Sequence, residues 1–166
     1  MEKKYITKSY KETQKLGEDF ALGLYSWQAK EIKNRKTAIV LGLQGDLGGG
    51  KTTFLQGFAK GLRIKKKILS PTFVILKRFE IKNQNLKFTN FYHIDCYRLK
   101  NTKDILELDF KEIIKNPQNI VAIEWPERIK KALPKNIIII KFKFIYPEHS
   151  RRVDKNKREI VFKRGG

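Results

Sequence analysis

The stretch GDLGGGKTT, residues 45–53, places three consecutive glycines directly before a lysine and two threonines. Gly45, Gly50, Lys51 and Thr52 satisfy the spacing G-x-x-x-x-G-K-[ST] of the P-loop, or Walker A, motif. Glycine permits the backbone dihedrals and the close approach with which successive N–H groups surround phosphate oxygens. A helix that starts directly after the loop adds unpaired N–H groups and a positive dipole end. The motif therefore predicts a site for a nucleotide triphosphate.

Each polar side chain of this motif has an expected task. The Lys51 ammonium is expected to reach the β- and γ-phosphates, and the Thr52 hydroxyl to bind Mg²⁺. We expect the Thr53 hydroxyl to donate a hydrogen bond to an α-phosphate oxygen. The alternative is a glycine-rich turn without a ligand, and the strand and helix expected on either side of the loop argue against it.

Helices and strands alternate around this loop. The run TAIVLGL, residues 37–43, is apolar and β-branched and predicts a buried strand. Leu16, Phe20, Leu24 and Trp27 recur at spacings of four and three, which predicts a helix over residues 9–31. Further elements are expected at residues 51–62 (a helix), 72–81 and 86–95 (a hairpin), 102–116 (one or two short helices), 119–125 (a buried strand), 127–133 (a helical turn or two), and 136–145 and 158–163 (the last strands).

The length and the element order predict one domain over residues 1–166. Its expected class is α/β: a P-loop NTPase-like central, mostly parallel sheet with antiparallel strands added and helices on both faces. No run approaches about 18 uninterrupted apolar residues, and the start of the chain lacks the apolar stretch of a signal peptide. A single cysteine, Cys96, excludes an internal disulfide. We therefore expect a cytoplasmic protein with no membrane partner.

Two carboxylates stand at the ends of expected strands. Glu124 ends the run IVAIE, and Asp95 ends FYHID. A P-loop site needs such an acid near the metal, because Mg²⁺ prefers oxygen ligands. The alternative for both is a structural acid paired with a cation. Asp46, within the loop, can orient water or cap a turn, and Glu127 can be a helix N-terminal acid.

Three other features leave alternatives open. In SPTF, residues 70–73, Ser70 or Thr72 can meet the γ-phosphate and Mg²⁺, or the segment is only a proline turn that enters a strand. His93 is either a proton-transfer group or a hydrogen-bonded structural residue. The formal net charge of +20 fits contact with a polyanion such as RNA, or a lysine-rich composition without a binding role.

Several motifs together resemble one family. GDLGGGKTTF, SPTF, YHIDCYRL and IEWPE stand in this order, after TQKLGEDFA near the N-terminus. They are similar to the TsaE family, the bacterial ATPases of tRNA threonylcarbamoyladenosine biosynthesis. The resemblance implies a P-loop fold, ATP and Mg²⁺ as ligands, and weak ATPase activity. It also implies two partner proteins, TsaB and TsaD, which modify the adenosine next to the tRNA anticodon, so that tRNA is at least an indirect partner.

The resemblance carries over to particular residues. It implies a phosphate cradle formed by Gly48, Gly49, Gly50, Lys51, Thr52 and Thr53, with Thr52 on Mg²⁺. Glu124 matches the metal-associated glutamate of the family, and Asp95 matches its functionally important aspartate. Thr13 is implied near the nucleotide base, and Trp125 close to the nucleotide. An arginine near the C-terminus, either Arg151 or Arg152, is implied to touch the nucleotide.

Three other functions compete with this reading. A GTPase switch would need an N-K-x-D element, and the nearest match is NKRE at residues 156–159. A small kinase would need arginines clustered in a lid, whereas the arginines here are scattered. A non-enzymatic RNA-binding protein would show RNA affinity with a steep salt dependence and no effect of ATP.

Overall fold

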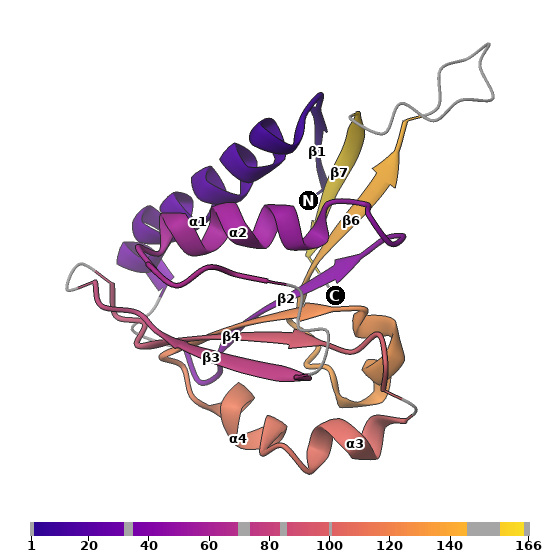
Figure 1. Cartoon of the computed structure of the whole chain (residues 1–166). Coiled ribbons are helices and arrows are strands. Elements are labelled where there is room, and N and C mark those ends of the chain that lie inside the picture. Colours follow the sequence, from indigo (N-terminus) through magenta and orange to yellow (C-terminus); the bar gives the residue numbers. More distant parts are fainter. Residues whose placement is uncertain are drawn as a thin grey trace.

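The computed structural model describes residues 2–31, 35–69, 74–83, 86–99, 101–145 and 157–164, without the side chains of residues 25–31 and 164. Its strands are β1 (Glu2–Thr7), β2 (Ile39–Gln44), β3 (Leu76–Glu80), β4 (Asn90–Asp95), β5 (Asn119–Glu124), β6 (Ile138–Phe144) and β7 (Arg158–Arg164). They form one sheet in the order β1-β7-β6-β2-β5-β4-β3 (Figure 1). The expected SPTF contact with phosphate falls on residues 70–73, which lie outside the described ranges.

The middle of this sheet is parallel and its margins are antiparallel. β2 pairs in parallel with β5 and β6, and β5 pairs in parallel with β4. The outer pairs, β1 with β7, β7 with β6, and β3 with β4, are antiparallel. Every residue of β5 is buried, because helices cover both sides of the central strands. The predicted α/β class is confirmed, and so is the expected pairing of the segments that contain β3 and β4.

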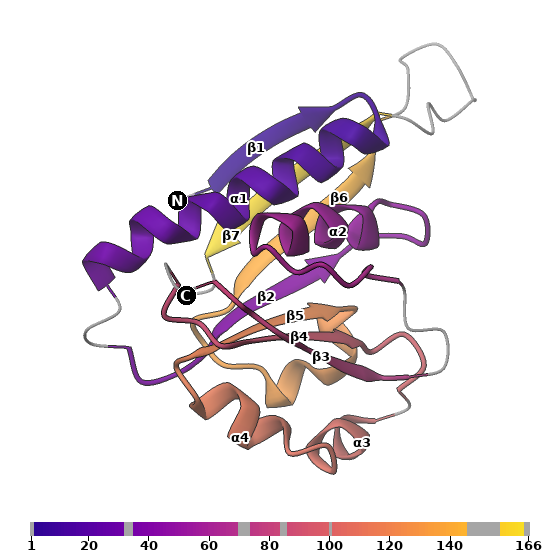
Figure 2. The ribbon, with the colours of Figure 1, turned by 60° about the vertical axis from the view of Figure 1, so that its left-hand side comes forward.

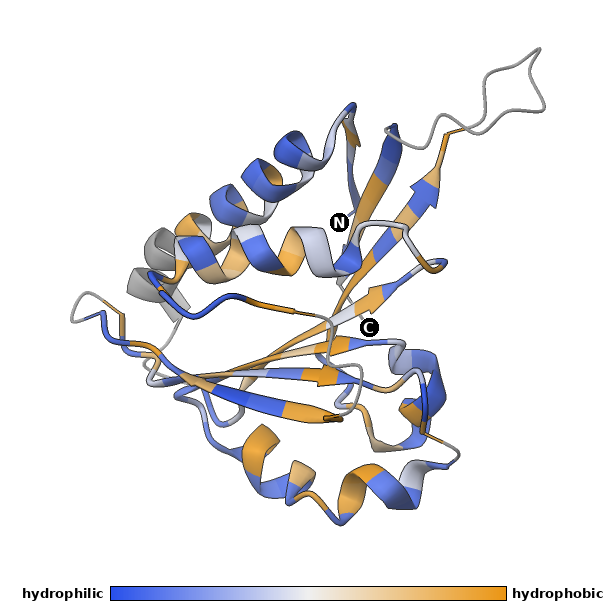
Figure 3. Ribbon diagram, viewed as in Figure 1, coloured by the Kyte–Doolittle hydropathy of each residue, from blue (hydrophilic) through white to orange (hydrophobic). Residues whose placement is uncertain are grey.

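Helices cover the two faces of the sheet (Figure 2). Alternate β2 residues point to opposite faces: Ile39 and Leu41 belong to one apolar cluster, and Val40 to the other. In Figure 3 the central strands are mostly orange, and α1 alternates between polar and apolar colours. Among the described helices, none is long and apolar enough to cross a membrane. On one face lie α1 (Tyr10–Glu31) and α2 (Lys51–Gly61), and on the other α3 (Thr102–Leu106), α4 (Phe110–Lys115) and the 3₁₀ helix η2 (Pro126–Ala132).

The sequence did not predict β1. Five of its six residues are exposed, so it lacks the apolar alternation that marks a half-buried strand. Its place at the margin of the sheet depends on contacts with β7 instead. Lys4 forms an ion pair with Glu159, and the Tyr5 ring meets the Phe162 ring edge-on at 5.5 Å between centroids. A charged edge strand of this kind also discourages pairing with other chains.

Helices α1 and α2 approach so closely that a Cβ atom would clash at Gly17, Gly57 and Gly61. A Cβ atom built on Gly57 would lie 1.8 Å from the backbone oxygen of Gln14. On the facing helix, a Cβ on Gly17 would lie 2.1 Å from the backbone oxygen of Phe54. Because these neighbours are backbone atoms, they cannot turn aside as side chains do. The glycines therefore set the distance between α1 and α2.

We predict that Gly57→Ala lowers the free energy of unfolding by about 1–3 kcal/mol, as expected for overpacking. Gly23→Ala is the matched control, since a Cβ there meets no other atom of the described residues within 4 Å. It should raise the free energy of unfolding by about 0.5–1 kcal/mol, because alanine loses less backbone entropy in a helix. Urea unfolding followed by circular dichroism measures both. Equal effects of the two substitutions would contradict the close contact.

Candidate functional site

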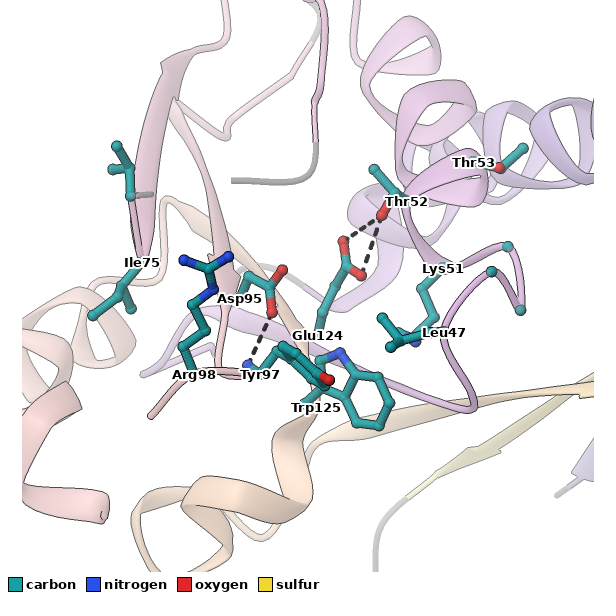
Figure 4. A pocket seen from close by; sticks show the side chains of 14 residues that line it. Leu47, Lys51, Thr52, Thr53, Ile75, Asp95, Tyr97, Arg98, Glu124 and Trp125 are labelled. Atoms are coloured by element: carbon teal, nitrogen blue, oxygen red, sulfur yellow. Dashed lines mark hydrogen bonds between the residues drawn. The ribbon is translucent and has the colours of Figure 1, made fainter. Parts of the chain in front are cut away.

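A cavity of about 590 Å³ opens where β2, β5 and β4 end. In a parallel sheet these carboxyl ends meet at one edge, where the loops that follow them can form a binding site. Figure 4 shows side chains from the loop, β4 and β5 facing this space. Its walls consist of Leu47, Gly48, Gly49, Gly50, Lys51, Thr52, Thr53, Val74, Ile75, Asp95, Tyr97, Arg98, Glu124 and Trp125.

The glycines let the loop turn from β2 into α2. Gly50 precedes α2 with φ at 101°, in the left-handed region that residues with a Cβ rarely adopt. At Gly45, where φ is 139°, a Cβ would lie 2.4 Å from the Phe142 backbone oxygen. The Phe54 amide donates to the Gly50 oxygen at 2.9 Å, which starts the helical hydrogen bonds. The amides of residues 51–53 precede that bond, so the helix itself does not use them.

The Lys51 side chain bends back over its own loop. Its Nζ donates to the backbone oxygens of Gly45 at 2.7 Å and Asp46 at 2.9 Å. The same atom lies 4.1 Å from the centre of the Trp125 ring. Burial lowers the pKa of Lys51, and nearby carboxylates, Glu124 first among them, oppose this shift. An anion in the cavity would therefore meet a cation that burial has already separated from water.

Thr52, Glu124 and His93 form a chain of hydrogen bonds. The Thr52 hydroxyl donates to Glu124 Oε1 at 2.9 Å and Oε2 at 3.2 Å (Figure 4). His93 Nε2 lies 2.9 Å from Glu124 Oε1, so the imidazole and the carboxyl group share a hydrogen bond. Both Glu124 and His93 are buried. His93 and Thr52 thus both contact Glu124 Oε1, and among the described residues the Nδ1 atom of His93 has no hydrogen-bond partner.

Asp95 faces the cavity from the end of β4, opposite Glu124 in the strand register. Its Oδ1 accepts a hydrogen bond from the Tyr97 amide at 2.9 Å. Arg98 adds a second cation to the cavity wall. Behind Asp95, burial foremost and then the nearby carboxylates raise the pKa of the Cys96 thiol to about 12. The thiol is therefore structural, whereas its neighbour Asp95 lines the cavity.

Trp125 turns the chain sharply after β5. It has φ at 59°, which is uncommon for a residue other than glycine. Its amide donates to the Leu43 oxygen at 3.1 Å, so the turn is fixed to the end of β2. The Tyr97 ring lies 5.2 Å from the Trp125 ring, and together the two aromatic rings form one wall beside Lys51.

The other candidates from the sequence lie apart from the cavity wall or outside the described residues. Thr13 is fully buried, and its hydroxyl donates to the Ser9 oxygen and meets the Thr7 hydroxyl at 2.9 Å. Its contact with a nucleotide base stays a prediction. Asp46 and Glu127 are exposed. Arg151 and Arg152 fall in residues 146–156, which are not described.

Sequence reasoning missed Arg158, the first residue of β7. Its Nε donates to the Gly49 oxygen at 3.1 Å, on the glycine loop itself. No local motif marks this arginine, because the contact arises only when β7 pairs with β6 and β6 pairs with β2. Tyr97 and Arg98 were also unassigned, although they follow Asp95 by two and three residues in YHIDCYRL.

Comparison with known proteins gives a consistent result. The model of the family described as threonylcarbamoyl adenosine biosynthesis protein TsaE matches residues 7–153. The tRNA threonylcarbamoyladenosine biosynthesis protein TsaE of Bacillus subtilis is 38% identical over 127 residues, which are 76% of this chain and 70% of that protein. Its namesake in Rickettsia typhi is 35% identical over 133 residues, 80% of this chain and 82% of that protein.

A solved structure agrees with the sequence comparisons. The crystal structure of Bacillus subtilis YdiB superposes with a TM-score of 0.67 at 27% identity, covering 100% of this chain and 87% of that one. The family match extends over most of the chain and includes the glycine loop, Asp95 and Glu124. The resemblance seen in the motifs is thereby confirmed, and the chain belongs to the TsaE family of tRNA threonylcarbamoyladenosine biosynthesis proteins.

Proposed function

We propose that this protein binds ATP with Mg²⁺, hydrolyses it weakly, and supports the TsaB–TsaD pair in forming threonylcarbamoyladenosine next to the tRNA anticodon. The observation that carries the proposal is the contact between Thr52 and Glu124 at 2.9 Å, beside Lys51 and at the start of α2, whose first three amides precede its helical hydrogen bonds. A hydroxyl, a carboxylate and a cation thus converge at the end of a glycine loop. This combination suits a triphosphate with its metal ion.

The loop residues fit a triphosphate. The amides of Lys51, Thr52 and Thr53 precede the first helical hydrogen bond and all three residues line the cavity. Lys51 now donates to two neutral backbone oxygens. Charged phosphate oxygens are stronger acceptors than these carbonyls. A bound triphosphate would therefore draw the ammonium from Gly45 and Asp46 and offset the charge that burial disfavours.

Thr52 and Glu124 fit Mg²⁺, which prefers hard oxygen ligands. Within the described ranges, no three His, Cys, Asp or Glu side chains gather closely enough to hold a metal ion by themselves. Phosphate oxygens and water would complete the shell, so metal binding should depend on the nucleotide. The ion would supply charge neutralisation at the β- and γ-phosphates. His93 would keep the Glu124 carboxylate aimed at Thr52.

The remaining residues of the cavity support the proposal of weak hydrolysis. Lys51 would stabilise charge that develops on the γ-phosphate, and Asp95 would orient the attacking water. One Asp95 oxygen already accepts the Tyr97 amide, which fixes the direction of the carboxylate. A further hydrogen bond or charge from a partner would then raise the rate by orders of magnitude.

Exposed apolar side chains at the cavity support a protein partner there. Leu47 is 64% exposed, Val74 48% and Tyr97 41%, and all three line the cavity. Apolar groups of this size gathered at a site commonly mark protein contacts. We propose that the TsaB–TsaD pair covers this mouth in the cytoplasm. The formal charge of +20 would attract the tRNA on which the pair acts.

We predict that Lys51→Ala weakens ATP binding by about 10- to 100-fold, the expected loss for a charged hydrogen-bond donor. Lys60→Ala is the control, because Lys60 lies on the same helix but is exposed and pairs with Glu18 at 3.0 Å. Calorimetric titration with ATP and with GTP gives both affinities and tests the GTPase alternative. ATP affinity of Lys51→Ala equal to that of the unmodified protein would refute the phosphate cradle.

We also predict that Glu124→Gln raises the Mg²⁺ concentration for half-maximal ATPase activity by about 10- to 100-fold. The amide keeps the shape of the side chain but removes the charge that would favour the metal. Glu127→Gln is the matched control, since Glu127 is exposed three residues further on. Activity measured across a magnesium titration decides the point. An unchanged titration in Glu124→Gln would assign the metal to Asp95 or to water.

A third prediction concerns the partner proteins. ATP should change the affinity of this chain for the TsaB–TsaD pair by about 5- to 150-fold, the usual range for coupled sites. Calorimetry with and without ATP measures this coupling. Lys51→Ala should bind the pair equally in both conditions. If the unmodified chain binds the pair with the same affinity whether or not ATP is present, the proposed regulation is wrong.

A further inference from the structure

The glycine loop faces the cavity on one side and contacts the last strand, β7, on another. Arg158 Nε donates to the Gly49 oxygen at 3.1 Å, and Nη2 of the same guanidinium lies 3.4 Å from the Gly48 oxygen. We infer that Arg158 is a positioning residue that fixes two peptide planes of the loop in the orientation that binds phosphate. The inference rests on the proposed nucleotide binding and goes beyond it, since Arg158 itself acts only through the loop.

The planarity of the peptide bond explains how this works. In a trans peptide the carbonyl of one residue and the N–H of the next point in opposite directions. A guanidinium that holds the Gly49 carbonyl therefore directs the Gly50 N–H away from β7. The plane that carries the Gly48 carbonyl is held at both ends, because its N–H, on Gly49, donates to the Asp46 oxygen at 3.0 Å. The loop thus keeps its shape without a ligand.

The fold holds Arg158 itself in place. As the first residue of β7, it pairs with Phe144 of β6 and with Thr7 of β1. Its guanidinium carbon lies 5.7 Å from the centre of the Phe144 ring, a distance at which cation and ring attract one another. The next residue, Glu159, points to the opposite face and pairs with Lys4. The strand register therefore decides that the arginine meets the loop.

The fit around Gly50 is tight. A Cβ built on Gly50 would lie 2.9 Å from Arg158 Nε and 3.0 Å from its Cδ. It would also lie 3.6 Å from the Thr13 methyl group, and Thr13 is tied to Thr7 by the buried hydroxyl pair. The loop is thus backed by β7 and by the start of α1. A side chain at residue 50 would therefore compete with the Arg158 side chain for the same space.

The chemistry of the side chain separates positioning from charge. Arginine presents several donors in a planar fork, which can hold two carbonyl oxygens at once. Lysine has the same charge on a single rotatable ammonium and cannot reproduce the fork. Glutamine offers a donor without the charge. If Arg158 positions the loop, both the lysine and the glutamine variant should bind ATP more weakly. If its role is purely electrostatic, the lysine variant should keep its ATP affinity.

The test compares Arg158→Lys and Arg158→Gln with Lys143→Ala, a control for the loss of a cation. Lys143 is exposed on β6, and its register partner is Glu159 on the opposite face from Arg158. Both Arg158 variants should bind ATP about tenfold more weakly, as for one lost hydrogen bond of this class. The kcat at saturating ATP should stay near that of the unmodified protein, because Arg158 does not touch the reacting atoms. Lys143→Ala should match the unmodified protein in both ATP affinity and kcat.

A second measurement does not depend on turnover. In NMR spectra of the nucleotide-free protein, the amide resonances of Gly49 and Gly50 should shift in Arg158→Lys. The amide resonances of β2 and β5 should keep their positions. Full ATP affinity in Arg158→Lys would overturn the positioning role and leave the proposed function intact. Unshifted amide resonances would overturn it too. If the unmodified protein bound no ATP, the proposed function would fail, and this role with it.

Discussion

The parallel register of β2, β5 and β4 is the constraint on which the site depends. It sets Leu43 beside Glu124, and Glu124 beside Asp95. Because side chains alternate along a strand, a slip of one residue would turn Glu124 to the opposite face of the sheet. The Thr52 hydroxyl would then lose its acceptor. The register is secure because β5 is buried on both faces, so a slip of one residue would exchange its apolar side chains between the two cores and disrupt the packing of each.

The site is assembled from two directions. From the front, β4 and β5 bring carboxylates to the loop, and the aromatic wall of Tyr97 and Trp125 confines Lys51. From behind, side chains of β7 and of the start of α1 lie against the backbone of the loop. The approach of α1 to α2 through Gly17 and Gly57 therefore affects more than the core. It also decides how firmly the loop is backed, since α1 carries Thr13 and α2 begins at the loop.

Local signals in the sequence predicted the parts of the fold that are local in origin. The apolar run before the glycines and the acid at the end of β5 can both be read from neighbouring residues. β1 could not be predicted, because its stability comes from pairing with β7 and its own residues are mostly exposed. The role of Arg158 could not be predicted for a related reason. Its contact with the loop depends on the order β7-β6-β2, and strand order is a property of the whole sheet. For His93 the sequence offered a hydrogen-bonded structural role as one alternative, but it could not identify the partner, Glu124, which lies 31 residues away on the next strand.

The buried thiol of Cys96 makes this chain convenient for spectroscopy. It is the only cysteine in the sequence, it is fully enclosed, and its pKa of about 12 keeps it protonated near neutral pH. Thiol reagents react with the thiolate, so Cys96 of the folded protein should react with them very slowly. A single cysteine introduced on the surface could then carry a fluorophore or a spin label without removal of the native residue. Distances between the cavity mouth and a bound partner would then become measurable in a protein whose core is unaltered.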